Sequence, residues 1–242
     1  LRDAAHHLLV FGRDGQPAGQ IDLPYPVAVE LAAARPADDH LLMGVQRFQS
    51  PLTLWRHDFT EHRTSVFRAS AIKRDLADAE VHQILVPASH EARVPMFVVH
   101  RRGHVPDGTA PTLLTGYGGY GFPELPRFST LAQSWIERHR GVYAVAGLRG
   151  GGEKGAAWHE AGRRRNKPTT FADLIACSEW LVAQGYTRPD RLALIGASNG
   201  GLVVSASLLR RPDLFGAVVA RVPTTDMLRF HRFTVGAFWA SE

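Results

Sequence analysis

The chain has 242 residues, 45% of them hydrophobic and 21% charged, a composition typical of a globular protein with a substantial core. Its net charge of +5 comes from 28 basic residues, only three of them lysine, interspersed with acidic residues. This distribution excludes the basic, aromatic-interleaved stripe of nucleic-acid-binding proteins, and the lack of an apolar run of about eighteen residues excludes a membrane-spanning helix.

The first residues, beginning Leu1-Arg2-Asp3, have neither a starting methionine nor the basic-then-apolar layout of a signal peptide. We therefore expect the sequence to begin within a longer protein. The single cysteine, Cys177, excludes an internal disulfide and is expected to be an inert buried thiol. We expect a cytoplasmic protein, with a periplasmic or secreted one as the alternative.

Residues 1–80 resemble a series of short strands separated by turn-forming residues. The expected strands cover 7–11, 26–30, 40–45, 52–58 and 65–69. This spacing predicts antiparallel β structure, too small for a self-standing sandwich but similar to the last part of a β-propeller.

From residue 81 onward, strand-like and helix-like segments alternate. Strands are expected at 81–86, 94–100, 112–115, 141–148, 192–195 and 217–222, and helices at 128–139, 171–184 and 200–211. Such alternation predicts an α/β fold with a largely parallel sheet covered by helices. Thr170 and Asp173 are spaced as a capping box at the start of the helix at 171–184.

The most informative motif is Gly196-x-Ser198-x-Gly200, which follows an apolar strand and opens a helix. A nucleophilic serine projects from a sharp strand-to-helix turn, and glycine on both sides avoids collisions between the strand and the helix. The helix that starts here directs its N-terminal amides toward a developing oxyanion. The motif therefore predicts a serine hydrolase.

Several further motifs, in order and with similar spacing, give residues 80–242 a resemblance to the catalytic domain of the prolyl oligopeptidase family. They are VPMFVVH at 94–100, YGGY at 117–120, RGGGEKG at 149–155, WH at 158–159, NK at 166–167, GY at 185–186, GASNGG at 196–201, RPDLFG at 211–216 and DMLRFH at 226–231. The resemblance implies an α/β-hydrolase domain at 81–242, incomplete at its C-terminal end, after the C-terminal part of a β-propeller at 1–80.

The resemblance also implies roles for individual residues. Ser198 matches the nucleophile, while the main-chain N–H of Asn199 and the hydroxyl of Tyr117 match the oxyanion hole. Trp239 matches the tryptophan that stacks on a substrate proline.

Two positions of the same pocket depart from the family pattern. Tyr120 stands where the family usually has phenylalanine, and Thr224 stands where an apolar residue is common. These two residues are expected to make the pocket more polar and the preference for proline less strict.

A nucleophilic serine needs a histidine base and an orienting acid. Asp226 and His231 follow Ser198, but only one helix and one strand intervene, and five residues leave no room for the strand that normally presents the histidine. We expect both to be structural, the acid and base of the family to lie beyond Glu242, and this chain by itself to be inactive.

The resemblance implies a serine endopeptidase that cleaves short peptides after proline through an acyl-enzyme, with access restricted by the propeller. Two alternatives stay open, an esterase or lipase on the same fold and a non-catalytic scaffold. The twelve histidines show no metal-binding spacing, so we expect no metal and no cofactor. The expected partners are short peptides, not nucleic acid or a membrane.

Overall fold

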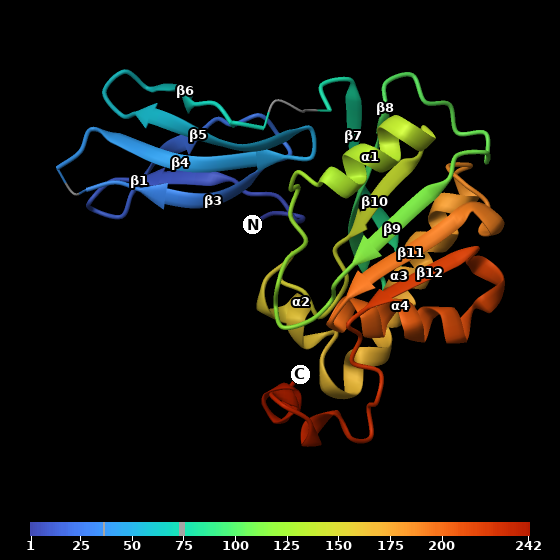
Figure 1. Ribbon diagram of the computed structural model, residues 1–242. Helices are drawn as coiled ribbons and strands as arrows, with labels where there is room; N and C mark the ends of the chain where they lie inside the picture. Colours follow the sequence, from blue (N-terminus) through green and yellow to red (C-terminus); the bar gives the residue numbers. More distant parts are fainter. Residues whose placement is uncertain (36, 73–75) are drawn as a thin grey trace. The chain divides into compact units, whose positions relative to one another are not determined.

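A computed structural model describes residues 1–35, 37–72 and 76–242 (Figure 1). The chain divides into two compact units. The first contains Leu1–Ala79 and Leu125–Gln133, and the second contains Glu80–Glu124 and Ser134–Glu242. The segment at 125–133 was expected within the hydrolase part, yet it joins the first unit.

The first unit is built of antiparallel strands around a small core. Strands β1 (Leu8–Phe11) and β2 (Pro17–Ile21) form a hairpin. A four-stranded sheet has the order β3 (Ala28–Ala33), β4 (His40–Arg47), β5 (Ser50–Asp58) and β6 (Arg63–Arg68). A four-stranded antiparallel meander is the repeating unit of a β-propeller, in agreement with the all-β prediction.

Strand β2 was not predicted from the sequence, because Pro17 and Gly19 interrupt any alternation of apolar and polar residues. It pairs along β1 and contributes the buried Ile21 to the core.

Two polar contacts attach the segment at 125–133 to the first unit. The Arg127 guanidinium forms a 2.5 Å ion pair with Glu30, and the main-chain N–H of Phe128 donates to Oε1 of Gln46 at 3.2 Å. These contacts link residues far apart in sequence, which explains why local reasoning did not place the segment there.

The second unit is organised around a six-stranded sheet. Its order is β12 (Ala217–Arg221), β11 (Leu192–Ala197), β9 (Thr112–Gly116), β10 (Val142–Ala146), β8 (Arg93–Arg101) and β7 (Ala79–Pro87). Strands β10, β9, β11 and β12 are parallel, and β8 is antiparallel to β10. The predicted α/β class with a largely parallel sheet is confirmed.

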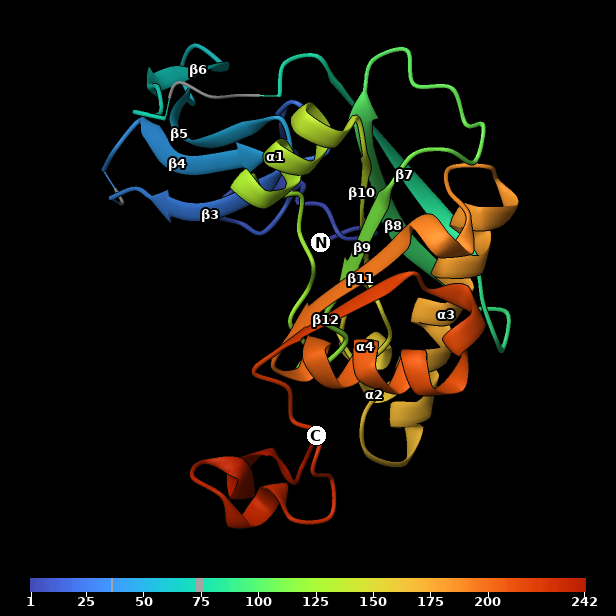
Figure 2. The same ribbon diagram turned by 45° about the vertical axis from the view of Figure 1, so that its right-hand side comes forward.

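The helices are α1 (Thr130–His139), α2 (Ala156–Glu160), α3 (Lys167–Ala183) and α4 (Asn199–Arg210). Short 3₁₀ segments lie at Arg164–Asn166, Pro189–Arg191, Pro212–Leu214, Phe230–Arg232 and Gly236–Trp239. Helices α3 and α4 lie side by side along the sheet (Figure 2). No helix among the described residues is long and apolar enough to cross a membrane.

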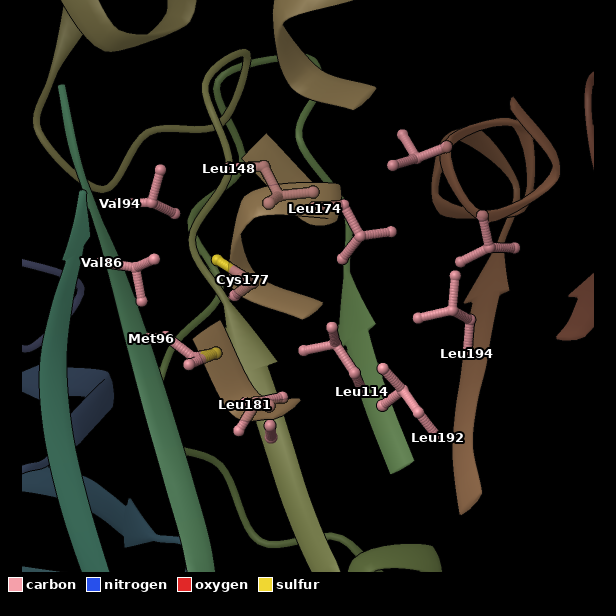
Figure 3. Packing of buried hydrophobic residues seen from close by; sticks show 14 of the residues in the cluster. Val86, Val94, Met96, Leu114, Leu148, Leu174, Cys177, Leu181, Leu192 and Leu194 are labelled. Carbon is pink, nitrogen blue, oxygen red and sulfur yellow. The ribbon is translucent and has the colours of Figure 1, made fainter. Parts of the chain in front are cut away.

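The main core lies between the sheet and helices α3 and α4, where aliphatic side chains interdigitate (Figure 3). Leu114 and Leu194 come from the sheet, and Leu174 and Leu181 come from α3; all four are fully buried. Cys177 lies in the same cluster, and burial raises the pKa of its thiol well above the usual value. This environment agrees with the expected inert thiol.

The predicted capping box is wrong. Helix α3 begins at Lys167, one turn before the predicted start, so Thr170 and Asp173 lie within it. The Thr170 hydroxyl donates to the carbonyl oxygen of Arg149 at 2.7 Å, and the fully buried Asp173 carboxylate pairs with the Arg149 guanidinium. Spacing alone did not reveal that Asp173 has a buried partner 24 residues away.

Candidate active site

Ser198 lies on the sharp turn between β11 and α4, with φ 55° and ψ −120°. A positive φ is rare for non-glycine residues and is a source of strain at functional sites. Two main-chain hydrogen bonds hold the turn, from Ser198 N–H to Arg221 O at 3.0 Å and from Leu202 N–H to Ser198 O at 3.1 Å. The serine side chain thus projects from a fixed turn between strand and helix.

The glycines around Ser198 are required by close backbone approaches. A Cβ on Gly196 would lie 2.1 Å from the carbonyl oxygen of Gly200, and a Cβ on Gly200 would lie 2.9 Å from that of Gly116. Contacts this short to backbone atoms cannot be relieved by rotating a side chain. The spacing of glycine around the serine therefore has the steric cause expected from the sequence.

Tyr117 follows β9 and brings its hydroxyl to the serine. The two side chains are hydrogen-bonded, and burial raises the pKa of Tyr117 above its usual value while that hydrogen bond opposes the rise. The phenol is consequently neutral around pH 7 and is available as a hydrogen-bond donor.

Asn199 is the first residue of α4, where main-chain N–H groups have no acceptor within the helix. Its side-chain Nδ2 donates to the carbonyl oxygen of Tyr117 at 2.6 Å. A Cβ on Gly119 would come within 2.6 Å of that same nitrogen. The loop carrying Tyr117 is therefore packed directly onto the start of α4.

A cavity of about 240 Å³ adjoins this group of residues. The three residues expected to form a substrate pocket, Tyr120, Thr224 and Trp239, all line it, together with Asn199. Burial raises the pKa of Tyr120 to about 12, so its ring enters the cavity uncharged. The structure thus brings together side chains from three segments that are far apart in the sequence.

Sequence reasoning missed the charged residues around the same cavity. Lys167, at the start of α3, donates from Nζ to the carbonyl oxygen of Gly118 at 2.9 Å, and burial lowers its pKa to about 8. The Glu242 carboxylate accepts from the main-chain N–H of Tyr120 at 2.5 Å and lies 2.9 Å from Nε2 of His159. The NK and WH motifs, which contain Lys167 and His159, were the signals of this cluster in the sequence.

Asp226 and His231 do not join Ser198. The Asp226 carboxylate accepts from Nε of Arg229 at 2.8 Å, and His231 is exposed with its ring edge against Phe230. Within the described part of the chain, no histidine is hydrogen-bonded to the Ser198 hydroxyl. The geometry thus brings Ser198, Tyr117 and Asn199 together at one turn, and among the described residues neither Asp226 nor His231 joins them.

Comparison with known proteins places this site in context. A family model described as "Prolyl oligopeptidase family" matches residues 126–242. The prolyl endopeptidase of Dictyostelium discoideum is 35% identical over 236 residues, 96% of this chain and 31% of that protein. A dual function macrocyclase-peptidase of Galerina marginata is 38% identical over 215 residues, 87% of this chain and 30% of that protein.

The chain is also similar to solved structures of prolyl peptidases. One from a study of two prolyl endopeptidases matches with a TM-score of 0.94 and 38% identity, over 100% of this chain and 36% of that chain. Prolyl oligopeptidase B from Galerina marginata, bound to a 25mer macrocyclization substrate, matches with a TM-score of 0.92 and 34% identity, over 100% of this chain and 34% of that chain. The chain spans about a third of the length of these proteins.

Proposed function

This chain belongs to the prolyl oligopeptidase family of serine peptidases, and from that premise we propose that it supplies the nucleophile, the oxyanion hole and the proline pocket of an enzyme that cleaves short peptides after proline. The observation that carries the proposal is the hydrogen-bonded pair Ser198 and Tyr117 beside the cavity lined by Trp239. An esterase of the same fold would have no evident need for this pocket, and the named relatives are peptidases.

In the proposed reaction the Ser198 oxygen attacks the carbonyl carbon of the scissile amide. Its proton passes to a general base, and the carbonyl oxygen becomes an oxyanion that accepts hydrogen bonds from the Asn199 N–H and the Tyr117 hydroxyl. The base passes the proton to the amide nitrogen, the C–N bond breaks, and the tetrahedral species collapses to an acyl-enzyme as the amine leaves. Water, deprotonated by the same base, then attacks the ester; the peptide leaves as its carboxylic acid and the proton returns to the Ser198 oxygen.

The pocket supplies the selectivity. The indole of Trp239 presents a flat apolar face against which a proline ring packs well. Tyr120 and Thr224 add hydroxyl groups to the same lining. We propose that these two residues relax the preference, so that small residues other than proline are also accepted before the cleaved bond.

We propose that the general base lies outside residues 1–242, a proposal supported by the fact that the chain spans only about a third of the length of the named relatives. A β-propeller completed outside this range would limit access to short peptides. Residues 1–242 alone are expected to hydrolyse a Gly-Pro amide no faster than their Ser198→Ala variant. Turnover of that amide by residues 1–242 that disappears in Ser198→Ala would contradict the assignment.

The test of function uses the complete protein with a Gly-Pro amide and a short-chain ester as substrates. The wild type is expected to prefer the amide, and Ser198→Ala to lose its hydrolysis. Tyr117→Phe, which removes one oxyanion donor, is expected to lower kcat about 10²-fold or more. A marked preference for the ester, unaffected by Tyr117→Phe, would support an esterase instead.

A further inference from the structure

Strands β7 and β8 form one edge of the six-stranded sheet (Figure 1, Figure 2), and they bring together three potential metal ligands. Glu80 and His82 are two residues apart on β7 and so lie on the same face of the strand, while His100 lies near the end of β8. One carboxylate oxygen of Glu80 and one ring nitrogen from each histidine all lie within 4.8 Å of one another.

The hydrogen bonding of His100 leaves one of its nitrogens available to a metal. Its Nδ1 lies 2.9 Å from the carbonyl oxygen of Arg101. A carbonyl oxygen only accepts, so Nδ1 carries the proton and Nε2 presents a lone pair. A backbone carbonyl that fixes the tautomer in this way is the usual outer partner of a metal-binding histidine.

The spacing between Glu80 and His82 fits shared coordination better than a direct hydrogen bond. Their nearest atoms, Oε2 and Nε2, are 3.7 Å apart. Two ligands that each bind one tetrahedral ion at about 2.0–2.2 Å are separated by roughly 3.3–3.6 Å. The side chains of Glu80 and His82 are 36% and 47% exposed, so both can rotate slightly and bring the 3.7 Å separation to the value for two ligands of one ion.

A fourth polar group adjoins His100. The ring of His104 lies 4.8 Å from that of His100, and its Nε2 is buried without a hydrogen-bond partner in the structure. Buried ring nitrogens normally have a partner. A water molecule on a metal ion beside His100 is a natural candidate for this role.

We propose that Glu80, His82 and His100 form a binding site for a divalent transition metal ion of the Zn²⁺ type, with water completing the coordination. Two imidazoles and one carboxylate suit Zn²⁺, whereas Ca²⁺ and Mg²⁺ favour sites made of oxygen ligands. The site lies apart from Ser198, because β9, β10 and β8 separate β11 from β7 in the sheet. The ion would link β7 to β8 and stabilise that edge of the sheet.

No sequence pattern indicated this site. Residues 80, 82 and 100 have no standard metal-binding spacing, and the expectation of no metal was based on that spacing. The hairpin between β7 and β8 is what brings them together, through contacts such as the 2.8 Å hydrogen bond from Ala88 N–H to Ala92 O.

The test is calorimetric titration of Zn²⁺ into the metal-free protein, with thermal unfolding measured in parallel. The wild type is expected to bind one equivalent at this site and to gain thermal stability, and a chelator is expected to reverse the gain. Substitution of residues that only hydrogen-bond to metal ligands lowers metal affinity about 10–100-fold. Because Glu80→Gln and His82→Gln change the ligands themselves, both are expected to weaken Zn²⁺ binding at least tenfold. His90→Asn, in the same hairpin, is the matched control and should bind like the wild type.

His100→Gln is expected to abolish binding, but it alters a buried residue and is interpreted only alongside a circular dichroism spectrum. Glu80 and His82 are partly exposed, so replacing them should not disturb folding, and their variants test the site even if His100→Gln does not fold. A wild type that binds no Zn²⁺, or Glu80→Gln and His82→Gln variants that bind it as tightly as the wild type, would overturn the proposal.

Discussion

The side-chain amide of Asn199 donates a 2.6 Å hydrogen bond to the main-chain carbonyl of Tyr117, although 82 residues separate the two in the sequence. This bond joins the turn that carries Ser198 to the loop that carries the tyrosine hydroxyl. Both proposed oxyanion donors, the main-chain N–H of Asn199 at the start of α4 and the phenol of Tyr117, are thereby held in one arrangement.

Replacing Asn199 with alanine tests this connection, because the variant keeps the main-chain N–H but loses the bond to Tyr117. A hydrogen bond contributes about 1–1.5 kcal/mol, so kcat of the complete enzyme on a prolyl amide is expected to fall about tenfold, with a smaller change in KM. Ser205→Ala removes a hydroxyl that donates within α4 at 2.8 Å and serves as the control. Equal kcat values in wild type and Asn199→Ala would show that the bond does not position the donors.

Thr224→Val tests the polarity of the cavity. Valine has nearly the same shape as threonine but no hydroxyl, so the lining beside Trp239 becomes more apolar. The ratio of kcat/KM for a prolyl amide over the matching alanyl amide is expected to rise severalfold. Tyr120→Phe should act in the same direction, and a falling ratio in both variants would exclude the proposed effect of the two hydroxyls.

Glu153 is fully buried, and burial raises the pKa of its carboxyl group to about 8, opposed by the hydrogen bond that it accepts from the N–H of Glu124 at 2.9 Å. Between the ordinary pKa of 4.5 and about 8, the unfolded chain releases this proton while the folded chain keeps it. The free energy of unfolding is therefore expected to fall as the pH rises through this window, and to level off above it.

Glu153→Gln provides the comparison, because glutamine resembles the protonated side chain and does not titrate. The free energy of unfolding is measured by denaturant at pH 5 and at pH 8. Between the two, the wild type should lose on the order of a few kcal/mol more of this free energy than the variant does. The same pH dependence in both proteins would mean that Glu153 ionises normally in the fold.

The ion pair between Arg149 and Asp173 joins the loop after β10 to α3, and both side chains are nearly excluded from solvent. Asp173→Asn leaves the guanidinium buried without its counter-charge and is expected to destabilise the protein by about 3–5 kcal/mol. The double variant Arg149→Met and Asp173→Leu should recover much of that loss. Glu179→Gln, which breaks the exposed pair with Arg211, is the control and should cost at most about 1 kcal/mol. A small effect of Asp173→Asn in urea denaturation would contradict this view.

The strand-turn-helix around Ser198 could be predicted from the sequence because its causes are local. Two glycines and an apolar strand specify the turn within a few residues, and the collisions at Gly196 and Gly200 confirm the reason for each glycine. The alternation of strands and helices after residue 80 predicted the sheet for the same reason, since periodicity is a local property. Strand β2 escaped prediction where Pro17 and Gly19 obscure that periodicity.

Long-range pairing was decided by the tertiary structure alone. The buried partner of Asp173, the attachment of residues 125–133 to the first unit and the grouping of Glu80 and His82 with His100 each join segments that no local pattern relates. The sequence by itself determined where the chain turns and which serine stands at the sharp turn between strand and helix. Only the packing of distant segments decided which side chains meet there, because burial and charge pairing depend on neighbours that the chain brings together after it folds.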